Sequence, residues 1–175
     1  MLEIYIQGLG DGVHAVDATC RAEDLPEMYP EFFGDVAVRG QMRIIGKRYS
    51  LNLTAKCKAR LTCDISLEEY EEEISADFSL AYLADAELYN MMDKDDMPAE
   101  TSSGERVIFP EDKTIDISED VREELCVNLP MKHVAPQYRD KDFFELHPEL
   151  KPKDTVSDFA DGDERWAKLK NFKLK

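Results

Sequence analysis

Residues 48–63 read RYSLNLTAKCKARLTC, and their apolar and polar side chains alternate without a break. The apolar set begins at Tyr49 and recurs at every second position as far as Cys63, while polar or basic side chains fill the positions between. Successive side chains of a β-strand point to opposite faces of a sheet, so this alternation predicts a half-buried antiparallel strand. The run exceeds the length of an ordinary strand, and we therefore expect a bend or a strong twist.

The flanking segments predict further strands of the same sheet. Apolar side chains of residues 36–44 share one face, and Gly46-Lys47 marks a reversal before the central run. After a turn at residues 64–66, residues 73–82 alternate again as a third strand. Residues 1–7 read as a strand and residues 13–20 as its returning partner, because the glycines between them tolerate the positive φ of a turn.

The second half of the chain has a different pattern. We predict an acidic mobile loop over residues 84–106, with a short helix near Ala84–Met92, because strand alternation stops there. The main helix is predicted from Ser118, whose hydroxyl is suited to an N-cap, to Leu129, because Pro130 cannot continue it. A last amphipathic piece spans residues 163–174.

These patterns predict the α+β class. We expect a twisted antiparallel sheet, or a partly closed barrel, with one main helix and an irregular C-terminal part. Residues 1–83 would form the sheet with a basic face, residues 84–106 the acidic loop, and residues 107–175 a helix-containing part packed on the same domain.

Composition predicts a cytoplasmic protein. The chain begins directly with a strand pattern, and it has no basic leader followed by an apolar run. No apolar stretch approaches the ~20 residues that a membrane helix needs. In the cytoplasm its four cysteines would be reduced thiols. The net charge of −16 favours solubility and repels nucleic acid at long range.

The charge is strongly segregated along the sequence. Residues 36–62 contain seven basic residues and no acid, whereas residues 64–124 contain 21 acids against four bases. Because the apolar side chains of the two basic strands share one face of the sheet, the basic side chains must share the other. A broad cationic face suits a phosphate backbone. The predicted RNA-binding residues are Arg39, Arg43, Arg48, Lys56, Lys58 and Arg60.

Local neutralisation is the alternative interpretation of this face. Glu73 and Asp77 fall on the polar side of the third strand, where cross-strand ion pairs would stabilise the sheet modestly. No aromatic residue interrupts the predicted basic face, so base stacking is not expected. A second basic group lies near the C-terminus and is either an RNA-docking segment or a helix that buries its tryptophan in the core. Its residues are Arg165, Trp166, Lys168 and Lys170.

The sequence offers no clear catalytic or metal site. Cys57 and Cys63 fall on the apolar face and are predicted to be core thiols. None of the three histidines pairs with a ligand at zinc spacing, and neither a phosphate-binding loop nor a nucleophile elbow is present. We predict a non-enzymatic protein without metal or cofactor. An active site assembled from distant residues stays open, since it would leave no local pattern.

Several segments in order resemble one protein family. They are Gly8-Leu9 with Gly12-Val13-His14, the strand end and turn at Leu61–Glu68, the segment at 114–117 followed by Glu124-Leu125 and Leu129–Pro136, and the closing Asp163–Lys170. Together they resemble the YceD-like family of large-subunit ribosomal RNA accumulation proteins. Within that family they resemble members from Chlorobi- and Bacteroidetes-like bacteria. Many members carry a second cysteine where this chain has Ser66, and a cysteine cluster where it has no cysteine after Cys126. A family zinc site therefore does not carry over, and Cys63 is half of a lost pair or a core residue.

The resemblance implies a non-enzymatic factor that supports accumulation or processing of large-subunit ribosomal RNA. That RNA or its precursor would be the partner, contacted through the basic β-face. In the alternative, the acidic stretch Glu68–Glu124 is a protein–protein module that holds a basic ribosomal protein or an assembly factor. We expect no membrane partner.

Overall fold

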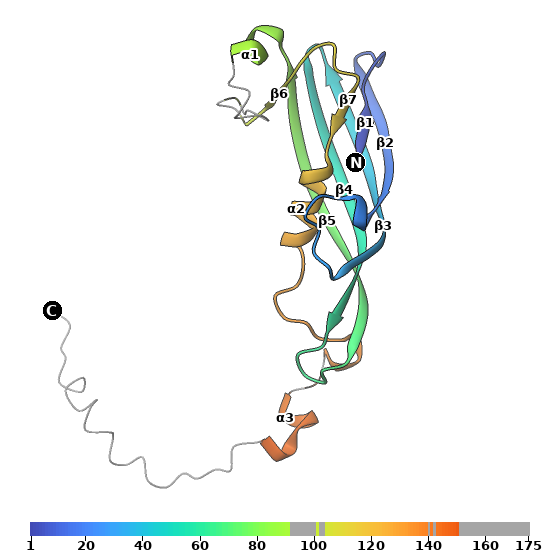
Figure 1. Ribbon diagram of the computed structural model, residues 1–175, viewed down its shortest axis with the longest axis vertical. Coiled ribbons are helices and arrows are strands. Elements are labelled where there is room, and N and C mark those ends of the chain that lie inside the picture. Colours follow the sequence, from blue (N-terminus) through green and yellow to red (C-terminus); the bar gives the residue numbers. More distant parts are fainter. Residues whose placement is uncertain (92–100, 102–103, 140, 142, 151–175) are drawn as a thin grey trace, which may run out of the picture. The chain divides into compact units, whose positions relative to one another are not determined.

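The computed structural model describes residues 1–91, 101, 104–139, 141 and 143–150. The chain divides into two compact units, residues 1–135 and residues 136–175. The strands and the main helix belong to the first unit (Figure 1). The described part of the second unit holds the short helices η3 (Pro136–Tyr138), α3 (Phe143–Leu146) and η4 (Pro148–Leu150).

The main sheet of the first unit has five strands in sequential order. The central run becomes the 15-residue strand β4, whose buried and exposed side chains alternate as predicted. The first four strands form an antiparallel meander, in which each strand pairs with the next along the chain. The five strands are β2 (Gly12–Arg21), β3 (Phe32–Ile45), β4 (Arg48–Thr62), β5 (Glu69–Ala84) and β6 (Arg106–Ile108).

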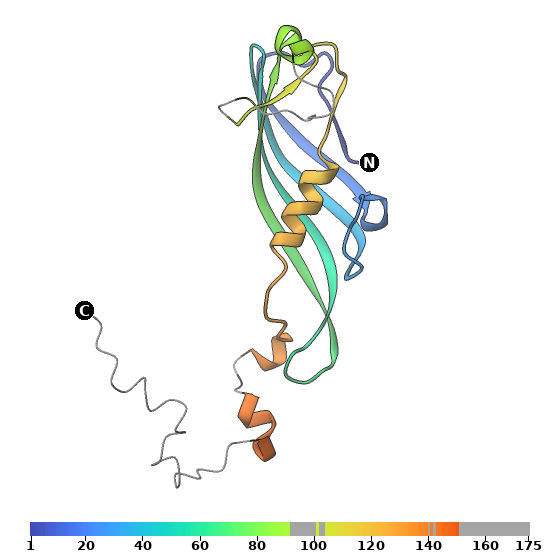
Figure 2. The same cartoon turned by 60° about the vertical axis from the view of Figure 1, so that its left-hand side comes forward.

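The predicted twisted sheet is confirmed, and it stays open rather than closing into a barrel (Figures 1 and 2). It is also mixed, because β6 pairs in parallel with Tyr82–Ala84 at the end of β5. Parallel neighbours need a connection of a dozen or more residues. The segment predicted as a loop supplies that connection, and it begins with the short helix α1 (Ala86–Met91), close to where a helix was expected. Residues 92–100 of this segment lie outside the described residues.

The N-terminal strand does not pair with its neighbour in sequence, contrary to prediction. Instead β1 (Glu3–Tyr5) and β7 (Thr114–Asp116) form a separate two-stranded sheet. The reason is burial: Leu2, Ile4 and Ile6 are each at most 6 % exposed and join the core of the main sheet. The small sheet thereby covers part of the main sheet's apolar face (Figure 1).

The main helix α2 (Ser118–Val127) covers another part of that face, packing against β4 and β5 (Figure 2). Its Val121 and Leu125 are fully buried. The helix begins where predicted and ends two residues early, but Ser118 is not its N-cap, because Ile117 occupies that position. The Ser118 hydroxyl instead donates to Asp116 at 2.6 Å and accepts the Leu2 N–H at 2.7 Å. The Ser118 hydroxyl therefore bonds to residues at the small sheet instead of capping the N-terminus of its own helix.

Candidate functional site on the open face of the sheet

The side chains of β2–β5 that point away from α2 form what we call the open face. All six basic residues predicted to bind RNA lie on it and are exposed, two on β3 and four on β4. The cause is the strict alternation of both strands, whose intervening side chains, such as Val38 and Leu51, are fully buried in the core. Cross-strand register brings the two sets together, with Arg39 opposite Thr54 and Arg43 opposite Ser50.

Four of the six basic residues make ion pairs with acidic side chains. The predicted partner Glu73 does lie 3.1 Å from Lys56, whereas Asp77 accepts a 2.6 Å hydrogen bond from the Thr54 hydroxyl. The other three pairs are Arg39–Asp17 at 3.5 Å, Arg48–Glu105 at 3.1 Å and Arg60–Glu71 at 3.4 Å. The open face is therefore partly neutralised from β2, from β5 and from the residue before β6.

Most of these pairs are weak because their side chains are exposed. Both partners are 52–76 % exposed in the pairs of Arg39, Lys56 and Arg60. Such pairs contribute ~0–1 kcal/mol each, so a phosphate group can replace the carboxylate at little cost. Arg43 and Lys58 make no ion pair with any described residue, and they are the most available positive charges of the six.

An aromatic side chain also lies on the open face, so the prediction that none interrupts it was wrong. Phe33 is half-buried on β3, opposite Lys58, and the guanidinium carbon of Arg60 lies 5.1 Å from the centre of its ring. This ring lies outside the strand predicted over residues 36–44, because β3 begins at Phe32 and continues through an irregularity between Phe33 and Ala37. Gly34 adopts a φ of 78° there, which favours glycine.

Phe33 lines two hollows of the surface. One has a volume of about 270 Å³ and includes Arg60 and Thr62 in its lining. The other has a volume of about 370 Å³ and includes Lys56 and Lys58. Phe33 thus lines two hollows that carry both basic and acidic side chains, with Glu31 and Glu69 in the first and Asp35 and Glu73 in the second.

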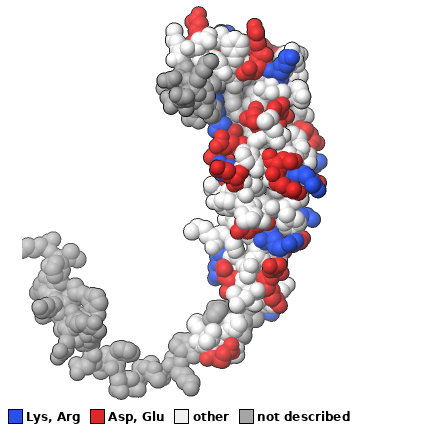
Figure 3. All heavy atoms as spheres, viewed as in Figure 1, with Lys and Arg blue, Asp and Glu red and all other residues white. Residues whose placement is uncertain are grey.

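The face of the first unit that Figure 3 shows carries mixed charge. Figure 3 shows acidic and basic side chains side by side over the visible face of residues 1–135. The predicted docking residues Arg165, Trp166, Lys168 and Lys170 lie outside the described residues. Within the described ranges, no helix is long and apolar enough to cross a membrane.

Two of the sequence segments that carried the family resemblance meet at Cys63. The Asp64 N–H donates to the His133 carbonyl and the His133 N–H donates to the Asp64 carboxylate, both at 2.7 Å. Cys63 is fully buried, and burial opposes ionisation of its thiol. Donors from Ala135, Ser66 and Ile65 outweigh that effect and lower the pKa of Cys63 from 9.0 to about 7.

Ser66, at the position of the family's second cysteine, thus donates a hydrogen bond to the Cys63 sulfur. In the part of the chain that the structure describes, no group of three or more Cys, His, Asp or Glu side chains is placed to hold a metal ion. Cys63 in this chain is therefore a buried, hydrogen-bonded thiol that joins the β4 turn to residues 133–135.

Comparison with known proteins gives one family. A family model described as "Large ribosomal RNA subunit accumulation protein YceD" matches residues 51–173. The match includes Lys56, Lys58 and Arg60, the Cys63 turn and α2, whereas β1–β3 precede it. No curated protein and no solved structure matches the chain.

Proposed function

Because the chain belongs to the YceD family of large ribosomal RNA subunit accumulation proteins, we propose that it supports accumulation of that RNA by contacting it directly through the open face. The observation that carries this proposal is the placement of six exposed basic side chains on one face of β3 and β4 that none of the described helices covers. Phosphate contacts need positive side chains that can reach a backbone from one surface. The open face supplies them.

Arg43 and Lys58 would provide the primary phosphate contacts, because neither must first release a carboxylate of a described residue. The paired residues Arg39, Lys56 and Arg60 would exchange their exposed carboxylates for phosphates. Phe33 adds a surface on which an unpaired base can stack. The acidic remainder of the protein repels RNA, which restricts contact to this face.

The test is binding of purified protein to large-subunit precursor RNA across a salt series. Arg43→Glu/Lys58→Glu reverses the two unpaired charges, and Lys113→Glu/Lys132→Glu makes the same charge change at exposed lysines elsewhere. We expect wild-type affinity to fall as salt rises, because phosphate neutralisation releases counterions. The first variant should lose most of this affinity and the second little. The five-fold reversal of Arg39, Arg43, Lys56, Lys58 and Arg60 should abolish binding.

Two results would count against the proposal. Equal losses in the two double variants would mean that RNA senses only net charge. No salt-dependent binding by the wild type would exclude direct contact through the open face.

A further inference from the structure

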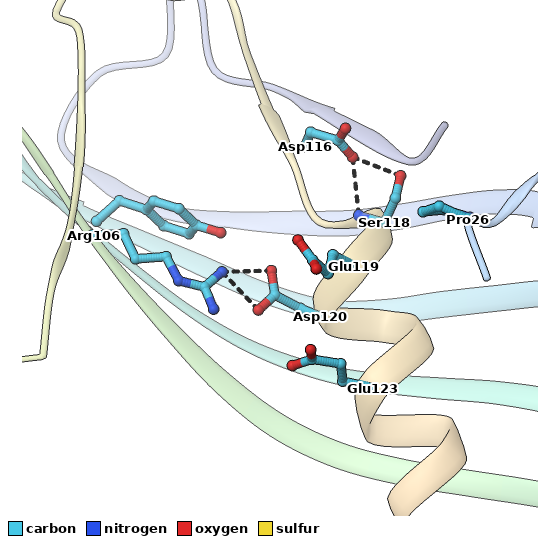
Figure 4. Close-up of a pocket in the computed structure, with 8 residues that line it drawn as sticks. Pro26, Arg106, Asp116, Ser118, Glu119, Asp120 and Glu123 are labelled. Atoms are coloured by element: carbon cyan, nitrogen blue, oxygen red, sulfur yellow. Dashed lines mark hydrogen bonds and ion pairs between the residues drawn. The ribbon is translucent and has the colours of Figure 1, made fainter. Parts of the chain in front are cut away.

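A hollow of about 530 Å³ lies beside the start of α2, on the side of the sheet away from the open face. Glu119, Asp120 and Glu123 project into it from the first two turns of the helix, and Arg106 reaches Asp120 from β6 (Figure 4). These acids and Arg106 belong to the acidic stretch of residues 64–124, whose sequence pattern predicts no cavity.

An ion pair lines the hollow. Nη1 of Arg106 lies 2.6 Å and 2.7 Å from the two carboxylate oxygens of Asp120. The side chains are 24 % and 8 % exposed respectively, so this pair is largely shielded from water. Its geometry holds the Asp120 carboxylate in a fixed position at the wall of the hollow.

Tyr82 also lines the hollow, and its hydroxyl is buried beside the Arg106 side chain, with no hydrogen-bond acceptor among the described residues. The residue is 3 % exposed. The neighbouring Arg106 side chain has donors only, so it offers no acceptor for the hydroxyl hydrogen. A buried hydroxyl hydrogen without an acceptor costs ~1–3 kcal/mol, which points to a missing acceptor.

Negative charge exceeds positive charge around this ion pair. Burial raises the pKa of Asp120, Arg106 lowers it, and the neighbouring Glu123 and Glu119 raise it again. Burial and Asp120 likewise raise the pKa of Tyr82 to about 12. Arg122 of the same helix lies 3.1 Å from Glu123 and 3.8 Å from Glu119 and offsets part of their charge.

Two adjoining hollows extend the first one into a groove. One shares Tyr82 and Asp116 with it, and the other shares Pro26, Asp116 and Ser118. Against the groove's acids stand Arg106 and the Met1 amino group, while Arg21 pairs with Glu23 at 3.3 Å. The seven acids that line the three hollows are Glu23, Asp24, Asp112, Asp116, Glu119, Asp120 and Glu123.

We propose that this acidic groove binds an extended basic segment of a protein partner, with one arginine or lysine side chain seated beside Asp120 and a peptide carbonyl accepting the Tyr82 hydroxyl. Three adjoining hollows give room for several residues of an extended peptide, and the excess of carboxylates selects a cationic one. The site is separate from the open face and does not depend on the RNA contact proposed above.

The test measures binding of a fluorescein-labelled, alternating Arg-Ala peptide by fluorescence anisotropy. Glu119→Gln/Glu123→Gln removes two exposed carboxylates of the groove, and Glu87→Gln/Glu111→Gln removes two exposed carboxylates elsewhere. We expect the first variant to bind about tenfold more weakly than wild type and the second to bind like wild type. Tyr82→Phe should fold normally and also bind more weakly, because it removes only the hydroxyl.

Each outcome bears on the groove alone. Equal weakening in both double variants would show non-specific attraction to an acidic protein and overturn the proposal, as would no measurable binding by the wild type. Unchanged peptide affinity in Tyr82→Phe would show that the hydroxyl does not contact the peptide and would overturn that part of the proposal. The precursor-RNA assay separates the two proposals, since Glu119→Gln/Glu123→Gln should bind RNA normally and Arg43→Glu/Lys58→Glu should bind the peptide normally.

Discussion

The backbone N–H of Ala135 donates a 3.4 Å hydrogen bond to the sulfur of Cys63, across 72 positions of sequence. The bond fastens the last residues of the first unit to the turn after β4. Because the thiol accepts several such bonds, its ionised form is favoured in the folded state.

This thiol should make stability depend on pH between 7 and 9. The folded-state pKa of about 7 lies below the ordinary 9.0, so ionised Cys63 stabilises the fold fully above pH 9, and that contribution is lost as pH falls towards 7. Thermal unfolding of wild type minus Cys63→Ala, in reductant, should give a difference that grows from pH 7 to pH 9. Burial raises the pKa of Cys57, so the corresponding difference for Cys57→Ala should stay flat over this interval and change only above pH 9.

Gly40 of β3 should not tolerate a side chain. A Cβ atom at this position would collide with the backbone of Asn52 and Leu53 on β4. Gly40→Ala should therefore lower the free energy of unfolding by ~1–3 kcal/mol, as in other overpacked sites. Urea denaturation measures the change, and Gly10→Ala is the control because nothing lies within 4 Å of its added Cβ. Equal stability of the two variants would show that β3 and β4 can separate without cost.

Leu125 should contribute strongly to the packing of α2 on the main sheet. It is fully buried, so Leu125→Ala should lower the free energy of unfolding by ~2–5 kcal/mol through lost burial and the cavity it leaves. Val127 on the same helix is 80 % exposed, and Val127→Ala should change stability by no more than ~0.5 kcal/mol. Denaturant titration measures the free energy of unfolding of both variants. A loss in Val127→Ala as large as that in Leu125→Ala would contradict the assignment of the buried face of α2.

Phe33 should matter for single-stranded RNA more than for duplex RNA. Stacking on an aromatic ring requires an unpaired base and contributes ~1–3 kcal/mol per base. Phe33→Leu keeps the apolar volume near Arg60 but removes the aromatic face, so affinity for single strands should fall while duplex affinity changes little. Parallel titrations with a single-stranded and a duplex RNA of equal charge would measure this, and equal losses for both would indicate a purely structural role.

Period-two alternation predicted β4 and its neighbours because burial alternates along a strand that is covered on one face only. The same rule placed Arg39 and Lys56 on one face. The pairing of β1 with β7 could not be predicted, because a partner more than a hundred positions away leaves no local pattern. Ser118 was misassigned for a related reason, since its hydroxyl bonds to Leu2 rather than to its own helix.

The candidate sites were predictable only in part. The sign of the charge on each segment was evident from the sequence, but the ion pairs of the open face depend on cross-strand register and side-chain reach. Phe33 was missed because the strand boundary lay inside a segment rich in prolines and turns. The groove was missed because Arg106 enters it from β6. A strand of three residues is too short for its sequence to predict parallel pairing with β5.

The pairing of β1 with β7 also has a consequence for synthesis of the chain. The meander from β2 to β5 forms from neighbouring strands and can assemble as the nascent chain emerges, since its contacts are local in sequence. The Leu2 N–H, in contrast, must wait for a hydroxyl 116 residues later. Until Ser118 and Leu125 have left the exit tunnel, the sheet's apolar side remains uncovered at the mouth of the ribosome that is translating it.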